Sequence, residues 1–127
     1  MRVYVAGLYS RRPDGAQAGI IDALMNMRAG MKASVEVLLS GNVPFCPWLD
    51  YQFWLVLPDG EEIPIEAIKA YSMEWLRVSE AILLLPGWEM SPGSCAELAE
   101  AKRLGLEVFD GMEQFRAFVD IDRRSKA

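Results

Sequence analysis

The run Ala81–Leu85 (AILLL) restricts the fold more than any other feature, because its five aliphatic residues have no polar break. A strand that is apolar at every position has both faces covered, as in the centre of a parallel sheet. A Pro-Gly turn follows at residues 86–87, and a helix-like segment follows at Pro92–Leu104. This order of elements predicts an α/β protein with a parallel sheet.

The rest of the chain alternates in the same way. The predicted strands are Arg2–Ala6, Val43–Pro47, Ala81–Leu85 and Leu106–Phe109, and the predicted helices are Ala16–Leu39, Ile65–Val78, Pro92–Leu104 and Met112–Val119. Strands that alternate with helices imply a doubly wound sheet. We therefore expect a Rossmann/flavodoxin-like three-layer sandwich with a mainly parallel sheet of four to five strands.

The first predicted helix carries an apolar stripe. Its apolar residues recur at steps of three and four: Ile20, Ile21, Leu24, Met27, Met31, Val35 and Leu38. This spacing marks an amphipathic helix, whose apolar stripe ordinarily faces the core. Gly30 is expected to weaken or bend it.

Residues 48–64 (WLDYQFWLVLPDGEEIP) interrupt the alternation with an aromatic-rich insert and a Pro-Asp-Gly turn. The sequence leaves three interpretations open: a hairpin or lid, a local satellite core, and a patch that packs against a second subunit. Exposed aromatic clusters of this size are unusual on monomers, so the interface interpretation stands beside the other two.

The length of 127 residues fits one domain, expected over residues 1–121, with a charged and frayed tail at 122–127. No apolar run approaches the roughly 20 residues of a membrane span. The first residues lack the apolar stretch of a signal peptide and instead resemble a strand. We therefore expect a cytoplasmic protein that has no membrane partner.

Charge and composition exclude several functions. Thirteen Lys and Arg against eighteen Asp and Glu give a net charge of −5, which argues against a partner that is a nucleic-acid polymer. A small anion held by one or two arginines remains open. Because the chain has no histidine, we expect no metal and no cofactor, and acid–base chemistry must come from Asp, Glu, Tyr or Lys. Cys46 and Cys95 show no paired spacing and are expected to be buried free thiols.

Two loops are candidate parts of a binding site, because ligands of open parallel sheets bind where strands end and helices begin. They are Gly7–Gly15, after the first strand, and Pro86–Gly93, after the third. In the second loop, Ser91 is a good N-cap and Pro92 suits the first helical position. The open amides of that first helical turn favour an anion such as phosphate.

Glu97 is the candidate reactive group. It follows Gly93 by four residues and Ser94 by three, so it lies on their side of the helix. The positive helix end favours its charged form. A carboxylate beside a sugar-sized cleft attacks an anomeric carbon or stabilises an oxocarbenium ion. The alternative interpretation is structural: Glu97 only stabilises the positive end of the helix, and Ser91 only caps it.

The chain resembles the nucleoside 2-deoxyribosyltransferase family, including its 2'-deoxynucleoside 5'-monophosphate N-glycosidase branch and small phage-type relatives. The matching features span Tyr4 to about Phe109. They are Tyr4-Val5-Ala6-Gly7, Met73-Glu74-Trp75-Leu76, the phage-type Gly87-Trp88, Ser91-x-Gly93-x-x-x-Glu97, an Ala-rich helix and Leu104-Gly105. The serine-to-glutamate spacing is the specific part.

The resemblance implies roles for individual residues. Glu97 would be the nucleophile that forms a glycosyl-enzyme intermediate, and Tyr4 would position its carboxylate. The residues implied in binding a nucleoside or nucleotide are Gly7, Ser72, Trp88, Ser91 and Gly93, with Arg11 or Arg12 beside the phosphate unless both are plain surface charges. The resemblance also implies a homodimer or higher homo-oligomer, in which the active site often borrows residues from the neighbouring subunit.

One departure from the family pattern concerns Ser72, which stands where family members carry an aspartate. A serine cannot act as an acid near neutral pH. Losing a general acid costs on the order of 10²–10⁴ in rate, unless Asp50, Glu74 or Glu80 substitutes. The alternatives are therefore an enzyme, a catalytically weak or inactive nucleotide- or nucleotide-sugar-binding protein, and a structural protein that works through its aromatic insert.

Overall fold

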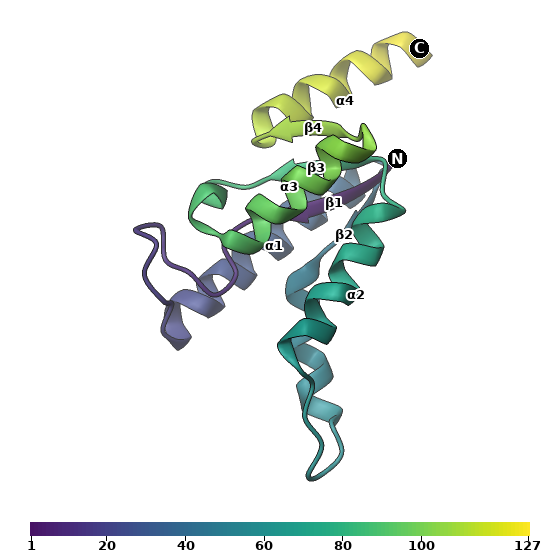
Figure 1. The fold of residues 1–127 in the computed structure, drawn as a ribbon. Coiled ribbons are helices and arrows are strands. Elements are labelled where there is room, and N and C mark those ends of the chain that lie inside the picture. Colours follow the sequence, from purple (N-terminus) through teal and green to yellow (C-terminus); the bar gives the residue numbers. More distant parts are fainter.

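A computed structural model describes all of residues 1–127. Four strands form one sheet in the order β2-β1-β3-β4 (Figure 1). They are β1 (Arg2–Ala6), β2 (Val43–Phe45), β3 (Ala81–Leu84) and β4 (Glu107–Asp110). Every pair of neighbouring strands is parallel, which confirms the predicted parallel α/β sheet.

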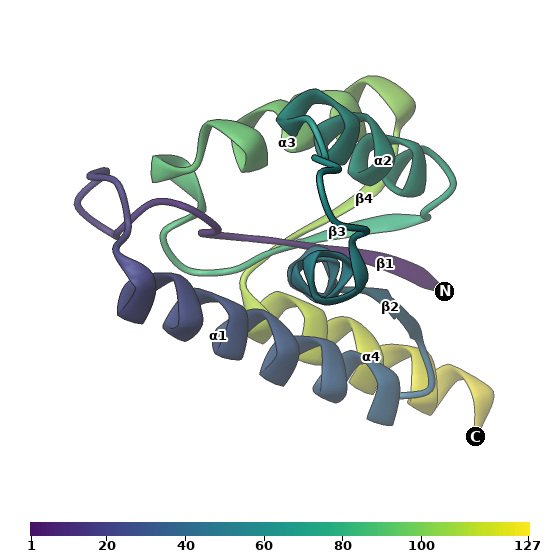
Figure 2. The same ribbon diagram turned by 90° about the horizontal axis from the view of Figure 1, so that it is seen from below.

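The helices cover both faces of this sheet. They are α1 (Ile20–Leu39), α2 (Ile65–Arg77), α3 (Pro92–Leu104) and α4 (Met112–Lys126), with two 3₁₀ helices, η1 (Pro47–Val56) and η2 (Trp88–Met90). Helices α2 and α3 lie on one face, and α1 and α4 lie on the other (Figure 2). The fold is therefore the expected doubly wound three-layer sandwich.

Two apolar clusters hold the layers together, one on each face of the sheet. Val3, Val5 and Leu83 point toward α1 and α4, where they join a twelve-residue cluster. Their chain neighbours Tyr4 and Ile82 point toward α2 and α3, in a seven-residue cluster. Alternate residues of a strand face opposite sides, so β3 contributes to both clusters and all four of its residues are buried. This confirms the prediction from its apolar run.

Several element ends differ from the predicted ones. Helix α1 begins at Ile20, because residues before it form a loop in which Arg11 and Gln17 make an isolated bridge. Strand β2 ends at Phe45, since Pro47 cannot donate to a ladder and instead starts η1. Helix α4 continues past its predicted end at Val119 and through the charged tail to Lys126.

The apolar stripe of α1 faces away from the core, contrary to the usual pattern. The helix buries Gly30, Ala33, Ser34 and Val37, whereas the stripe residues Ile20, Ile21, Leu24, Met31, Val35 and Leu38 are exposed. Gly30 explains this orientation: a Cβ there would lie 2.1 Å from the indole of Trp48. The small residues of α1 therefore face the core so that Trp48 can pack closely, and the larger ones remain outside.

The aromatic-rich insert is not a hairpin. Its first half is η1, a 3₁₀ helix of ten residues, although such runs seldom exceed three or four. Trp48 is buried in the core and donates a hydrogen bond from Nε1 to the carbonyl of Leu8 at 3.0 Å. Phe53, Trp54 and Leu55 are exposed at its far end. The insert and the start of α2 extend away from the sheet (Figure 1).

The two cysteines lie in different environments. Cys46 is a buried free thiol, as expected, whereas Cys95 is exposed on α3. Burial raises the pKa of the Cys46 thiol above its usual value. None of the helices is long and apolar enough to cross a membrane.

Candidate functional site

A cavity of about 250 Å³ opens at the carboxyl ends of β1 and β3. The chain leaves β1 toward β2 on one side and leaves β3 toward β4 on the other, so this is the point at which the strand order reverses. Crevices at such points are where doubly wound sheets bind ligands. The walls come from the end of β1, the loop after it, η1, α2 and the start of α3.

The start of α3 is built as the sequence predicts. Ser91 caps the helix, because its Oγ accepts a hydrogen bond from the amide of Ser94 at 3.2 Å, and Pro92 is the first helical residue. The buried Ser94 hydroxyl donates to the carbonyl of Gly7 at 2.8 Å, which joins α3 to the end of β1. The first turn of α3 therefore has a fixed position on the wall of the cavity.

The two glycines predicted in this site have different structural reasons. A Cβ at Gly7 would lie 3.1 Å from Cβ of Leu85 and 3.4 Å from the Trp48 ring, so tight packing favours glycine there. A Cβ at Gly93 would meet only the Ser91 hydroxyl, at 3.9 Å. Packing within the chain therefore does not require a glycine at position 93, and its surface lies open on the cavity wall.

Glu97 lines this cavity and is bound from the core side by Tyr4. Tyr4 is fully buried on β1, and its hydroxyl donates a hydrogen bond to Oε2 of the half-buried Glu97. Burial raises the pKa of the Glu97 carboxyl to about 7, although the hydrogen bond from Tyr4 lowers it in part. Burial therefore opposes the charged form of Glu97, which the helix end was expected to favour.

The Tyr4 hydroxyl remains a hydrogen-bond donor. Burial, followed by the charge of Glu97, raises its pKa well above the usual range, while Ser72 opposes this shift through a hydrogen bond. Ser72 is buried on α2 and lines the cavity. The structure thus brings Tyr4, Ser72 and Glu97 together from three separate elements.

The next acid along α3 has a different environment. Glu100 forms ion pairs with Arg77, at 3.0 Å, and with Arg103. These guanidinium groups lower the pKa of Glu100 to about 2. Glu97 has no ion-pair partner and faces the cavity. The two acids of α3 therefore differ, since Glu100 is neutralised by arginines and Glu97 is not.

A second carboxyl group, Asp50 of η1, lines the same cavity. Only 3% of its surface is exposed. The Tyr9 hydroxyl donates a hydrogen bond to Oδ1 of Asp50, and the Tyr9 ring stacks on Tyr51 with centroids 5.0 Å apart. Burial raises the pKa of Asp50, and the hydrogen bond from Tyr9 opposes this shift.

Asp50, Glu74 and Glu80, the three acids expected as possible proton donors in place of Ser72, lie in different places. Glu74 and Glu80 are exposed, and they pair with Arg77 and Arg2 outside the cavity. Asp50 is the one of the three that the fold brings to the site. Tyr9, which holds it, was missed by sequence reasoning because the contact joins residues 41 positions apart.

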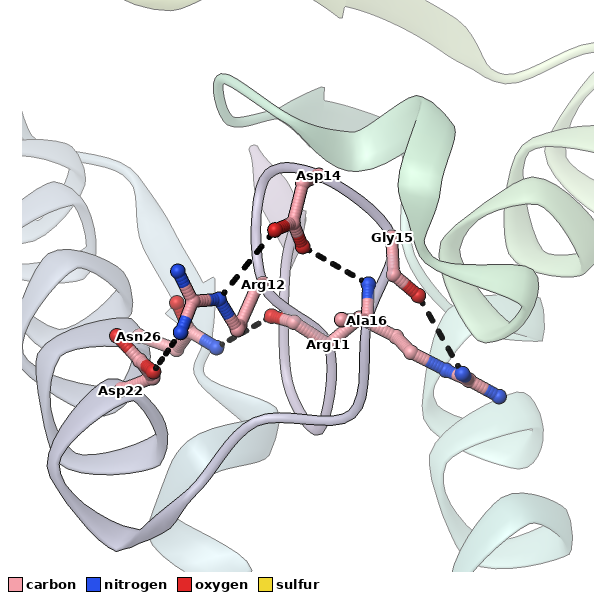
Figure 3. Close-up of polar contacts among 7 residues, drawn as sticks. All are labelled: Arg11, Arg12, Asp14, Gly15, Ala16, Asp22 and Asn26. Atoms are coloured by element: carbon pink, nitrogen blue, oxygen red, sulfur yellow. Dashed lines mark hydrogen bonds and ion pairs between the residues drawn. The ribbon is translucent and has the colours of Figure 1, made fainter.

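The two arginines of the first loop point in opposite directions (Figure 3). Arg11 lines the cavity, and its Nη1 donates to the carbonyl of Gly15 at 3.4 Å. Arg12 instead turns to Asp14, at 3.6 Å, and to Asp22 on α1, at 3.5 Å. Of the two candidates for a phosphate, the structure therefore places Arg11 in the site and Arg12 outside it.

Asn26 of α1 holds this loop in place. Its side-chain amide donates to the carbonyl of Tyr9 at 3.2 Å and to that of Arg11 at 3.0 Å (Figure 3 shows the second bond). Lys69 of α2 adds a second cationic residue to the cavity lining. Sequence reasoning missed both Asn26 and Lys69, and the only available signal was a polar residue within an otherwise apolar helix face.

Trp88 lies outside the cavity. Its Nε1 donates to Oδ1 of Asp110 at 3.3 Å, and its ring packs against the cluster between the sheet and the α2–α3 layer. The structure therefore does not bring Trp88 together with the other predicted site residues. No group of three or more Cys, Asp or Glu side chains is placed to hold a metal ion.

A comparison with models of protein families gives a match that covers most of the chain. The family model described as Domain of unknown function (DUF4406) matches residues 1–110, and a search of the curated proteins found no match. The matched range runs from β1 to the last residue of β4 and contains every residue that lines the cavity. The chain therefore belongs to the DUF4406 family.

Proposed function

We propose that the protein cleaves or transfers the N-glycosidic bond of a nucleoside, deoxynucleoside or nucleoside 5'-monophosphate, with Glu97 as the nucleophile. The observation that carries this proposal is the hydrogen-bonded Tyr4–Glu97 pair in a cavity at the reversal point of the sheet. The sequence resemblance to the nucleoside 2-deoxyribosyltransferase family supports the same chemistry at the same two residues.

The chemistry follows from the environment of Glu97. With a pKa of about 7, the carboxyl is ionised in about half of the molecules at neutral pH. Its ionised form has lost water, which makes it a stronger nucleophile than an exposed carboxylate. The bond from Tyr4 fixes its orientation, so one oxygen is held for attack on C1' of the sugar. A covalent glycosyl-enzyme intermediate would then pass the sugar to water or to a second base.

The remaining walls suit the rest of a nucleotide. The amide of Gly93, in the first turn of α3, has no partner within the chain and can bind an anion, and Arg11 and Lys69 add positive charge beside it. We therefore propose that the 5' side of the ligand lies at Ser91 and Gly93, with Arg11 near a phosphate. Arg11→Gln should weaken binding of 5'-monophosphates about tenfold and leave that of nucleosides unchanged, while Arg12→Gln serves as the matched control.

A second candidate function is ligand binding without turnover, and Ser72 is the observation that favours it. In this case the protein would bind a nucleotide or nucleotide sugar in the same cavity. Its distinguishing property would be stabilisation by ligand with no chemical product. The structural-protein hypothesis would instead give no response to any of these ligands.

One experiment separates these functions. Purified protein at high concentration is incubated with a panel of deoxynucleosides and their 5'-monophosphates, with and without acceptor bases, and free base is measured by chromatography. Melting temperatures are recorded with the same ligands. Release of base that is lost in a folded Glu97→Ala variant supports the enzyme, and stabilisation without base supports the binder. Neither response in any mixture excludes both.

We also propose that the chain forms a homodimer through α1 and η1. Thirteen of the twenty exposed large apolar side chains lie on these two helices, which border a groove of about 560 Å³. Apolar patches of this extent are rare on monomers, and a stable interface needs roughly 800 Å² per partner. Val35→Glu should give a monomer in sedimentation velocity, whereas Ile121→Glu on α4 should not. A monomeric wild-type protein would contradict the proposal.

A further inference from the structure

We propose that Asp50 is the general acid that protonates the departing base. This inference rests on the N-glycosidic function proposed above and assigns the proton donor that Ser72 cannot be. Asp50 and Glu97 are the only two acidic residues that line the cavity. A pair of carboxyl groups about one cavity is what cleavage of a glycosidic bond requires, one for the sugar carbon and one for the leaving atom.

The two carboxyl groups reach the cavity from different sides of β1. Glu97 comes from α3 and is bound by Tyr4, which lies on β1 itself. Asp50 comes from η1, which follows β2, and β2 pairs with β1 at its other edge from β3. Asp50 is also close enough for its charge to raise the pKa of Tyr4. A ligand bound in this cavity is therefore in contact with both walls.

The surroundings of Asp50 favour a carboxyl group that carries a proton. It is almost completely buried and forms no ion pair. A buried acid without a cationic partner retains its proton to a higher pH than an exposed one. The titratable groups around it are Tyr4 of β1, Tyr9 of the first loop, Cys46 before η1, Tyr51 of η1, and the cavity residues Arg11, Lys69 and Glu97.

Tyr9 is a positioning residue for Asp50. Its hydroxyl donates a hydrogen bond to Oδ1 of the carboxyl group and so restricts the orientation of that group. The Tyr9 ring stacks on Tyr51, and the Tyr9 carbonyl is held by Asn26. Asp50 is therefore held in position by hydrogen bonding and ring stacking around it, as a proton donor must be, although it lies on an irregular segment.

The proposed reaction balances. An oxygen of the Glu97 carboxylate forms a bond to C1', the C1'–N bond breaks, and its electron pair moves to the base nitrogen, which takes the proton of Asp50. Water then attacks C1' and gives a proton to the Asp50 carboxylate while the bond to Glu97 breaks. Both carboxyl groups return to their initial states. In transfer, an acceptor base takes the place of water.

The test compares two leaving groups. A natural deoxynucleoside needs protonation of its base, whereas 4-nitrophenyl 2-deoxyriboside releases a stable anion that needs no proton. Asp50→Asn should lose a factor on the order of 10²–10⁴ in kcat/KM on the nucleoside and remain within a few-fold of wild type in kcat/KM on the nitrophenyl compound. The comparison uses kcat/KM because this constant reports formation of the intermediate, before the step in which Asp50 takes a proton from water. Asp50→Glu should recover part of the loss. The control Glu97→Gln should lose both activities.

Other results overturn the inference in distinct ways. Asp50→Asn with wild-type activity on the nucleoside removes the role of Asp50 and leaves the proposed function intact. An equal loss in kcat/KM on both substrates assigns Asp50 to structure alone. A wild-type protein inactive on both substrates removes the glycosidic function and this inference with it.

A second variant protects the test if Asp50→Asn does not fold. Tyr9→Phe keeps the ring and its stacking but removes the hydroxyl that lowers the pKa of Asp50. The alkaline limb of the kcat/KM profile on the nucleoside should therefore move to higher pH, with a smaller loss in kcat. An unchanged profile would contradict the inference, because a purely structural role for Asp50 does not predict any shift.

Discussion

The site contains two tyrosine–carboxyl pairs that differ in what supports them. Tyr4 and Glu97 lie on regular elements, β1 and α3, and Tyr4 is part of the core. Tyr9 and Asp50 lie on a loop and on a 3₁₀ helix. Both carboxyl groups are buried enough for desolvation to raise their pKa. The site thus contains a framework pair, Tyr4 and Glu97, on regular elements, and an irregular pair, Tyr9 and Asp50, on a loop and a 3₁₀ helix.

The difference shows how each pair depends on the rest of the protein. The Tyr4–Glu97 pair is set by the β1–β3 register and by the Ser91 cap, so it depends on regular backbone structure. The Tyr9–Asp50 pair depends on how Trp48 anchors η1 and how Asn26 holds the loop. Variants should therefore affect the two pairs separately.

The largest effect should come from the framework pair. Glu97→Gln keeps the shape of the side chain and removes the proposed nucleophile, so kcat should fall by on the order of 10⁴–10⁶. Release of base from a deoxynucleoside, followed by chromatography, measures this loss. The retained melting temperature of the variant serves as the control for folding. Activity within tenfold of wild type would assign the nucleophile to another residue.

Tyr4→Phe weakens the same pair without removing the carboxyl group. A hydrogen bond to a charged group contributes roughly 1.5–3 kcal/mol, so kcat/KM at neutral pH should fall by about 10- to 100-fold. Because the Tyr4 bond lowers the pKa of Glu97, its loss should raise that pKa further, and the acid limb of the pH profile should move to higher pH. A pH profile over pH 5–9 detects this shift. An unmoved acid limb would show that the ionisation of Glu97 does not control the rate.

The parts of the molecule that the sequence predicted are those governed by local rules. The apolar run at Ala81–Leu85 predicted a buried strand, and Ser91 followed by Pro92 predicted a capped helix; the structure has both. The spacing between Ser91 and Glu97 placed the acid at the cavity because a helix has a fixed rise and turn. The Tyr4–Glu97 contact, in contrast, was expected only through family resemblance.

The parts that were not predicted depend on contacts between distant segments. The apolar stripe of α1 indicates a buried face, but the fit of Trp48 against Gly30 decides which face turns inward. Asp50 had no motif, and its position follows from η1, whose 3₁₀ form the sequence did not indicate. Arg11 and Arg12 are adjacent in sequence, and only the fold separates them.

A change at the Gly30–Trp48 contact should affect the irregular pair more than the framework pair. Gly30→Ala places a Cβ where the indole lies, and overpacking of this kind costs about 1–3 kcal/mol. We expect a melting temperature lower by several degrees and a loss of activity on nucleosides that exceeds the loss on the nitrophenyl compound. Gly19→Ala is the control, since nothing lies within 4 Å of its Cβ position. Equal losses on both substrates would show that the two pairs do not respond separately.

The smallest expected effect is on the free energy of unfolding, which the buried carboxylate of Glu97 lowers at high pH. The pKa of Glu97 is about 7 in the folded protein, above its ordinary value, so the folded state prefers the protonated form. The favourable contribution is complete below about pH 4.5 and is lost as pH rises through 7. Glu97→Gln, which stays neutral, should therefore exceed wild type in unfolding free energy at pH 8 by roughly 3 kcal/mol, and the gap should close by pH 4. Urea denaturation at several pH values measures this difference, with Glu89→Gln on the exposed η2 as a control without such a trend. A gap independent of pH would mean that the Glu97 carboxylate is as well solvated in the folded protein as in the unfolded chain, and the cavity would then lack the desolvated nucleophile on which its chemistry depends.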